Sequence, residues 1–345
     1  MQGLIIPGNK PYSHGMSNIK KIGSLVSIIF ISFTLAAEEK EGGHYGFTLS
    51  PGMGILCGHA EEIVYKYSKN DQYLSELLWD LKPLVYFGLD AGFGPRDPFR
   101  RHGFIMDGSF KYGLPLKTGI IEDRDWMSGN NYLTHYSRHD AISKMALLAD
   151  VSAGYSWRLT DYLALGAYGD FVYMRFSWDA KDGYIQYAGE DGHGDYYHWS
   201  SDIEKDEISG VGIKYTQNWF ILSPGISLAG KLGHYFTLRG DICYSPLIYS
   251  VNRDDHIFKK IIYWDYPALG HYINGGVRFT FSPTANFDLE LSAFYRFIKG
   301  SRGRSYEQSA YPGSKAYQTS SDGAGSGFSA LDVSLAAKIR VFGRD

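Results

Sequence analysis

The chain of 345 residues carries 34 Lys and Arg against 37 Asp and Glu, which gives a formal net charge of −3. This balance offers no electrostatic case for binding nucleic acid, and we exclude nucleic acid as a partner. Aromatic residues make up 16% of the chain, and Gly and Tyr number 41 and 28, a composition that favours an all-β chain with many turns.

The first part of the chain has the pattern of a secretory signal peptide. Two lysines precede a short apolar run at 22–35, and a small-x-small cleavage site ends at Ala36. The apolar run is too short for a comfortable transmembrane helix. We therefore expect a signal peptide over 1–37, with initiation at Met16 and an uncleaved anchor as open alternatives, and a single mature domain over 38–345.

Runs with one apolar face recur along the rest of the chain. From Phe104 to Leu114 the apolar residues stand mainly at even positions, with Asp107, Ser109 and Lys111 between them. Alternation with period two is typical of β-strands, and runs of about ten residues suit strands that cross a membrane. A soluble sandwich would leave the charged residues inside such long strands without a water-filled lumen to face.

These runs predict an all-β fold, a ten-stranded antiparallel transmembrane β-barrel with short periplasmic turns and long extracellular loops. Closure into a barrel removes the open edges of the sheet. The strands are expected at 44–67, 73–95, 102–121, 138–158, 162–187, 205–230, 235–251, 262–282, 287–301 and 324–342. The long loops are expected at one end of the barrel, at 68–72, 122–137, 188–204, 252–261 and 302–323.

Two acidic stretches fall in these expected loops. Asp123 and Asp125 project to one side of an extended chain, and Arg124 projects to the other. Further along the chain, Asp254 and His256 again share one side. We expect these two pairs to face each other across a common cleft at one end of the barrel.

Three motifs carry a resemblance to a known family. They are Asp123-Arg124-Asp125-Trp126-Met127, Ser137-Arg138-His139 and Asp254-Asp255-His256. Each motif is weak evidence by itself. Together, and with this spacing and strand count, they resemble the signatures of the omptins, outer-membrane endopeptidases built on a ten-stranded barrel. The resemblance extends over most of the mature chain.

The resemblance implies a metal-independent, aspartic-type hydrolase in which a His-Asp dyad faces an Asp-Asp couple, with a water between them. His256 would be the general base that activates the water, and Asp254 would orient its imidazole. Asp123 would position the water, and Asp125 would support the couple electrostatically. The reaction would need no cofactor, and peptides or proteins would be the substrates.

The resemblance also bears on substrate choice. Omptins commonly cleave between two basic residues, and Glu62 matches the acidic residue expected from the first strand. Asn252 stands where a second acid is expected, and His135 stands near a third such position. Because each missing charge weakens selection of Arg or Lys, we expect a relaxed preference for basic residues.

Family members depend on lipopolysaccharide bound to basic residues of the outer wall. Arg175 matches one of these positions, whereas Asn218 stands at the second. We therefore expect outer-membrane lipid as a partner and leave its requirement as an activator open. The alternative role for Arg175 is a snorkelling contact with a lipid headgroup.

Other interpretations remain beside this one. Asp and His ligate zinc, but no His-x-x-x-His or comparable spacing supports a metal site. Ser137 and His139 suggest a serine nucleophile, yet no Gly-x-Ser-x-Gly motif accompanies them. The alternative from another class of protein is a non-catalytic outer-membrane barrel that acts as an adhesin or small pore. A ten-stranded barrel is narrow enough for side chains to fill it, which argues against an open pore.

Overall fold

The computed structural model describes residues 45–67, 70–128 and 132–342, and the signal peptide expected at 1–37 lies outside this part of the chain. Within the described ranges no helix is long and apolar enough to span a membrane. The fourteen strands are β1 (Tyr45–Tyr67), β2 (Asn70–Pro95), β3 (Gly103–Gly113), β4 (Lys117–Asp125), β5 (His135–Arg158), β6 (Leu163–Tyr187), β7 (Asp206–Glu207), β8 (Val211–Lys231), β9 (Phe236–Ser245), β10 (Ile248–His256), β11 (Ile261–Ala268), β12 (His271–Phe281), β13 (Phe287–Ser309) and β14 (Tyr317–Phe342).

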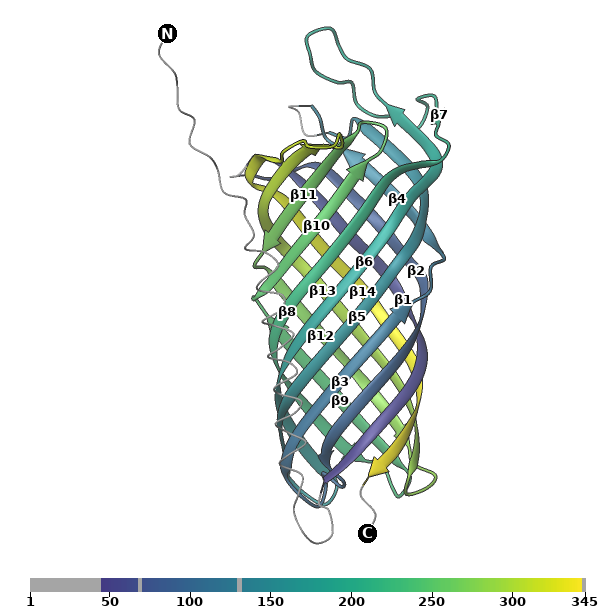
Figure 1. Cartoon of the computed structure of the whole chain (residues 1–345), viewed down its shortest axis with the longest axis vertical. Coiled ribbons are helices and arrows are strands. Elements are labelled where there is room, and N and C mark those ends of the chain that lie inside the picture. The colour runs from purple at the N-terminus through teal and green to yellow at the C-terminus, as the bar shows by residue number, and fades with distance from the viewer. Residues whose placement is uncertain (1–44, 68–69, 129–131, 343–345) are drawn as a thin grey trace, which may run out of the picture. The chain divides into compact units, whose positions relative to one another are not determined.

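The strands form one antiparallel sheet that closes into a barrel (Figure 1). From β1 the pairing runs through β2 to β3 and β4, and then through β5 and β6 to β8. Strand β8 pairs with β9 and β10, which pair with β12 and β11 respectively. Both of these pair with β13, and β14 joins β13 to β1. Closure leaves the long strands without an unpaired edge.

The fourteen strands differ from the predicted ten. Three of the predicted strands are interrupted, at 114–116, 246–247 and 269–270, and β7 is an additional strand of two residues. Pro115 and Pro246 stand in the first two interruptions, where they have no N–H to donate to a ladder. At the third interruption, Leu269 and Gly270 both adopt positive φ, 58° and 147°, which turns the chain out of strand geometry.

The strands also run further than expected at one end of the barrel. Asp123 and Asp125 lie on β4, and Asp254 and His256 lie on β10, so the expected loops at 122–137 and 252–261 are wrong at these positions. Their backbone groups continue the ladders of the neighbouring strands, as in the pairing of Asp123 with both Leu77 and Ser137. The expected loop at 302–323 is likewise reduced, because β13 continues to Ser309 and β14 begins at Tyr317.

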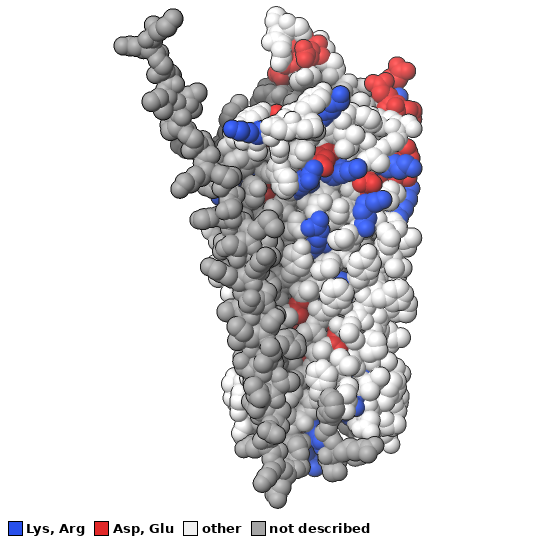
Figure 2. Space-filling model, viewed as in Figure 1, with Lys and Arg blue, Asp and Glu red and all other residues white. Residues whose placement is uncertain are grey.

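Large apolar side chains face outward in a belt around part of the barrel. Examples are Ile55, Leu89, Phe110, Leu228, Ile242, Phe279, Leu291 and Leu335. Strands β4 and β11 carry no exposed large apolar side chain, and the charged groups crowd the upper part of the face in Figure 2. The belt therefore marks the membrane-spanning part, and β4, β11 and the end of β10 lie beyond it.

Inside the belt the lumen is filled by paired charges. Lys111 and the Tyr86 hydroxyl both bind Asp332, and Arg296 binds Asp150. A cavity of about 120 Å³ remains among these side chains. These pairs satisfy one another in the interior, and they leave little free space.

An aromatic layer separates this ionic interior from the end of the barrel that carries β4 and β10. Trp79 stacks on Trp178 and on Tyr215, with ring centroids 5.7 Å and 5.2 Å apart. Phe176 continues the layer between Trp178 and Phe328. All five side chains are fully buried, so the layer closes the interior below the acidic stretches.

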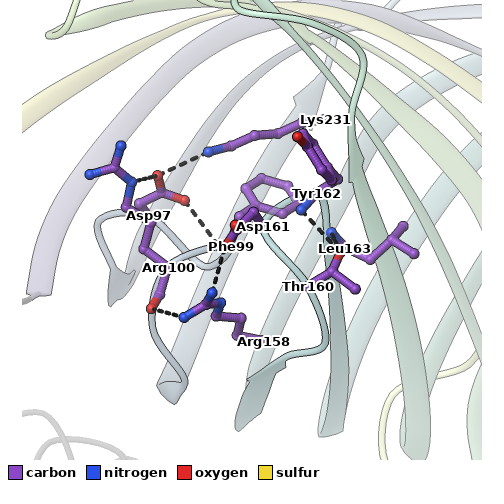
Figure 3. A network of polar contacts seen from close by, with 9 residues as sticks. All are labelled: Asp97, Phe99, Arg100, Arg158, Thr160, Asp161, Tyr162, Leu163 and Lys231. Atoms are coloured by element: carbon purple, nitrogen blue, oxygen red, sulfur yellow. Dashed lines mark hydrogen bonds and ion pairs between the residues drawn. The ribbon is translucent and has the colours of Figure 1, made fainter.

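The opposite end is held by short turns. Figure 3 shows Asp97, after β2, accepting a hydrogen bond from the backbone of Phe99 and pairing with Lys231 at the end of β8, 3.0 Å away. In the turn between β5 and β6, Thr160 Oγ1 accepts hydrogen bonds from two backbone N–H groups, and Arg158 pairs with Asp161. These contacts tie neighbouring hairpins together below the belt.

Candidate active site

The first half of the site lies on β4. Alternation along the strand turns Asp123 and Asp125 to the interior, where Ser75 of β2 donates a hydrogen bond to Asp123 Oδ1 over 3.2 Å. Arg124 projects to the other side and binds Glu122 over 2.7 Å. The side chains thus follow the parity expected from the sequence.

Both carboxylates of this couple are hard to ionise. Burial and the neighbouring charge of Asp125 raise the pKa of Asp123 well above its usual range. Burial also raises the pKa of Asp125, while the hydrogen bond from Ser75 lowers it. Because two close carboxylates titrate as a pair, the couple favours retention of one shared proton.

The second half of the site lies at the end of β10. His256 Nε2 donates a hydrogen bond to Asp254 Oδ2 over 2.5 Å, and Asp254 is 4% exposed. The imidazole ring and the Tyr263 ring of β11 pack in a T-shaped arrangement, with centroids 5.3 Å apart. Asp255 faces the other way and pairs with Arg253. The carboxylate and the Tyr263 ring together fix the orientation of the imidazole.

Barrel closure brings the two halves together. Strands β5, β6 and β8 separate β4 from β10 in the sheet, yet both strands lie at the same end of the barrel (Figure 1). The charge of Asp254 raises the pKa of Asp123, and the charge of His256 lowers the pKa of Asp125. The four residues therefore act on one another across the interior.

The two expected substrate-binding residues lie deeper, on the same inner wall. Glu62 is 3% exposed, and burial together with the charges of Asp254 and Asp265 raises its pKa well above its usual range. Asn252 Nδ2 donates a hydrogen bond to Ser326 Oγ over 2.6 Å, and Ser326 is the ladder partner of Glu62. Glu62 and Asn252 thus lie close to each other.

His135 lies beside the couple in an aromatic setting. Its ring contacts the edges of Tyr187 and Tyr196, with centroids 4.4 Å and 4.7 Å apart. Burial lowers the pKa of His135, while the charge of Asp125 raises it. This position therefore offers a neutral imidazole between phenol rings.

Ser137 and His139 also come together, with His139 Nε2 3.1 Å from Ser137 Oγ. The other ring nitrogen, Nδ1, lies 2.6 Å from the backbone carbonyl of Asp182, so a carbonyl and not a carboxylate orients this imidazole. Among the described residues, no group of three or more His, Cys, Asp or Glu side chains has a metal-binding arrangement.

Arg175, the expected lipid contact, lies on the outward side of β6. Its Nη1 donates a hydrogen bond to Asn218 Oδ1 over 3.2 Å, and Asn218 Nδ2 donates to the carbonyl of Val251 over 2.7 Å. The two positions expected for lipid binding are thus ladder partners on β6 and β8.

Two charged residues near the site belong to none of the sequence motifs. Lys259, in the turn between β10 and β11, lowers the pKa of Asp123, Asp125 and His135. Asp265, on β11, lies directly opposite Asn252. In the sequence, Asp265 is a lone acid among the aromatic residues of a strand-like run. This local pattern says nothing about the residues that face Asp265 across the barrel.

The fold and the site define an antiparallel outer-membrane type β-barrel with facing Asp-Asp and His-Asp pairs at one end. The model of the omptin family matches residues 44–340, and the chain belongs to the omptin family. This membership confirms the resemblance carried by the three motifs, and it puts the protein among outer-membrane proteases.

The barrel is similar to solved structures. The outer membrane protease OmpT from Escherichia coli superposes with a TM-score of 0.75 at 19% identity, over 88% of this chain and 100% of that one. The transport unit of the autotransporter AIDA-I from Escherichia coli gives a TM-score of 0.34 at 11% identity, over 88% and 92% of the two chains. The translocator domain of the autotransporter NalP from Neisseria meningitidis gives 0.32 at 8%, over 94% and 98%. No curated protein matches the sequence.

Proposed function

We propose that this protein is an endopeptidase of the bacterial outer membrane. It hydrolyses peptide bonds at the exterior mouth of a barrel of ten long strands. In this count, β3 with β4, β9 with β10, and β11 with β12 each make one long strand, and the two-residue β7 is left out. The observation that carries the proposal is the hydrogen-bonded pair of His256 and Asp254 facing the couple of Asp123 and Asp125.

The proposed reaction begins with a water between the two pairs. Because His256 Nε2 donates to Asp254, its Nδ1 is the nitrogen that accepts a proton from the water. The water oxygen attacks the carbonyl carbon of the substrate, and the imidazolium then gives the proton to the leaving amine. Asp254 stabilises the positive charge that His256 carries in between.

The couple on β4 supports the same step. Asp123 positions the water, and Asp125 sets the charge of the couple. Because burial raises the pKa values of both, a proton retained between them is available for a hydrogen bond to the water or to the carbonyl oxygen. The proposal needs no metal or cofactor.

Substrate choice differs on the two sides of the scissile bond. Glu62 supports recognition of a basic residue before the bond, since a buried carboxylate discriminates a cation from a neutral group strongly. After the bond, His135 with Tyr187 and Tyr196 offers an aromatic and neutral surface. We therefore expect the requirement for a basic residue to be relaxed on that side.

Outer-membrane lipid is the second proposed partner. Arg175 lies on the outer wall beside the apolar belt, where a basic side chain is suited to bind a lipid phosphate. Asn218 already accepts a hydrogen bond from Arg175 and adds no charge. Lipopolysaccharide is therefore proposed as an activator that acts through Arg175.

The experiment uses the protein refolded in detergent and a fluorogenic peptide with an Arg-Arg centre, with and without lipopolysaccharide. We expect cleavage that survives a chelator and falls by about 10²- to 10⁴-fold in Asp123→Ala and in His256→Ala. Asp255→Ala is the control, because Asp255 faces away from the site and pairs with Arg253. Full activity in both site variants would remove this site. A wild type that cleaves nothing but binds an intact protein would favour the non-catalytic adhesin.

A further inference from the structure

We propose that Asp265 and Glu62 together receive the guanidinium or ammonium group of the substrate residue that precedes the scissile bond. The inference rests on the proposed endopeptidase function and deepens it, because Asp265 belongs to none of the motifs that carry the family resemblance. It differs from the expectation of a subsite with a single charge, drawn from Glu62 and Asn252, which stays a prediction. The subsite has two acids, and the second comes from β11.

The register of β10 and β11 sets the direction of the Asp265 side chain. Asp265 is the ladder partner of Asn252, and directly opposite residues in an antiparallel pair project to the same face. Asn252 reaches Ser326 across the interior, and Ser326 is the ladder partner of Glu62 on β1. Asp265 and Glu62 therefore flank Asn252 on the inner wall.

The side-chain amide of Asn252 is hydrogen-bonded to neighbouring residues. Its Nδ2 donates to Ser326 Oγ over 2.6 Å, and its Oδ1 accepts from Ser250 Oγ over 2.6 Å. Both polar atoms of the amide thus have partners inside the protein. This side chain supports the wall and leaves recognition of a cation to the two acids.

The two acids, in contrast, each have a carboxylate oxygen that can still accept a hydrogen bond. Glu62 and Asp265 are 3% and 5% exposed, and Glu62 Oε2 and Asp265 Oδ1 have no hydrogen-bond partner within the described ranges. No Lys or Arg of the described chain forms an ion pair with either of them. A buried carboxylate without a cation is costly to keep, so an incoming cation is stabilised strongly at this place.

Two buried acids of the membrane-spanning part differ from Glu62 and Asp265 in having an internal cation. In the membrane-spanning part, Asp332 binds Lys111, and Asp150 binds Arg296. The lumen thus supplies an internal cation to these carboxylates. At Glu62 and Asp265 that cation is missing among the described residues, and a substrate Arg or Lys supplies it in our proposal.

The electrostatics agree with this role. Burial and the charge of Asp254 raise the pKa of Asp265 to about 7, and the charge of Asp265 in turn raises the pKa of Glu62. The charges of Glu62 and Asp265 both raise the pKa of the buried Tyr215, which stacks on Trp79.

The test compares two peptides that differ at one residue, Arg or citrulline before the scissile bond. Citrulline has nearly the shape of Arg without its charge, so the ratio of kcat/KM values reports recognition of charge. We expect a strong preference for Arg in the wild type, and a fall of that ratio by about 10- to 100-fold in Asp265→Asn. Asp255→Asn, a carboxylate on the outer side of β10, is the matched control and keeps the ratio of the wild type.

A second variant separates recognition from damage to the fold. In Asn252→Asp/Asp265→Asn the carboxylate moves to the opposite residue of the same ladder pair, so the preference for Arg should return. A wild-type ratio near one, or an unchanged ratio in Asp265→Asn, would overturn the inference. If the wild type cleaves neither peptide, the endopeptidase proposal fails. The ratio of the two peptides' dissociation constants, compared between wild type and Asp265→Asn, then decides on the subsite by the same criterion.

Discussion

Asn252 and Asp265 lie directly opposite each other on β10 and β11, and both polar atoms of the amide have partners whereas Oδ1 of the carboxylate has none among the described residues. Two adjacent inward positions thus hold one neutral and one acidic side chain. On β10 alone, the neutral Asn252 stands where the family resemblance implies an acid, and a charge is lost. In our proposal the wall as a whole keeps that charge, displaced by one strand.

The first prediction concerns pH and substrate preference. Because the pKa of Asp265 is raised to about 7, its carboxylate is ionised above this pH and protonated below it. The preference for Arg over citrulline should therefore fall as the pH decreases from 8 to 6. The measurement is kcat/KM for both peptides at each pH, with Asp265→Asn as the control, whose ratio should change less over the same range.

The second prediction concerns stability. The pKa of Asp265 is about 7 in the folded protein and about 4 in an unfolded chain, so folding takes up a proton between these values. The cost of burying this carboxyl is absent below pH 4, grows up to pH 7 and is then constant, at about 4 kcal/mol as an upper bound. Asp265→Asn should therefore raise the free energy of unfolding at pH 8 and leave it nearly unchanged at pH 4. Urea titrations in lipid vesicles measure both, and equal effects at the two pH values would contradict the shift.

The third prediction concerns the side after the scissile bond. His135 is kept neutral by burial, between Tyr187 and Tyr196. His135→Asp adds a carboxylate there, and cleavage before Arg or Lys should rise by about tenfold relative to cleavage before Ala. Profiling with a peptide library checks this. His193→Asp, in the exposed loop after β6, serves as the control and should leave the profile unchanged.

The fourth prediction concerns Lys259. Its charge lowers the pKa values of Asp123 and Asp125, so its removal should raise both. If ionisation of the couple limits the reaction on the acid side, the rising limb of kcat/KM against pH should move to higher pH in Lys259→Gln, by a fraction of a unit. Lys260→Gln, next in the same turn, is the comparison. A shift to lower pH would show that Lys259 acts in another way.

The fifth prediction concerns the lumen. Lys111 neutralises Asp332, which is 2% exposed. Lys111→Met leaves this carboxylate buried without its cation, and should lower the free energy of unfolding by about 3 to 5 kcal/mol. Lys144→Met removes a long ion pair, 3.7 Å, between an exposed Lys and the half-buried Asp179, and should change the free energy of unfolding by less than about 1 kcal/mol. Equal effects would contradict the view that the lumen is held by its buried charges.

The sequence by itself determined the all-β class, because alternation of apolar and polar residues depends only on the period of an extended chain. It also determined the parity that turns Asp123 with Asp125, and Asp254 with His256, to a common side. The ends of the strands were less well predicted, since ladders with neighbouring strands carry β4 and β10 up to these residues.

Only the tertiary structure decided which residues meet across the barrel. Asp265 and Lys259 act on the site through space, and no local pattern reports a charge that arrives from another strand or turn. The register between β10 and β11, set by pairing along both strands, brings Asp265 beside Asn252. Closure of the sheet then brings Glu62 to the same place, so in our proposal the number of charges that a substrate meets depends on that closure.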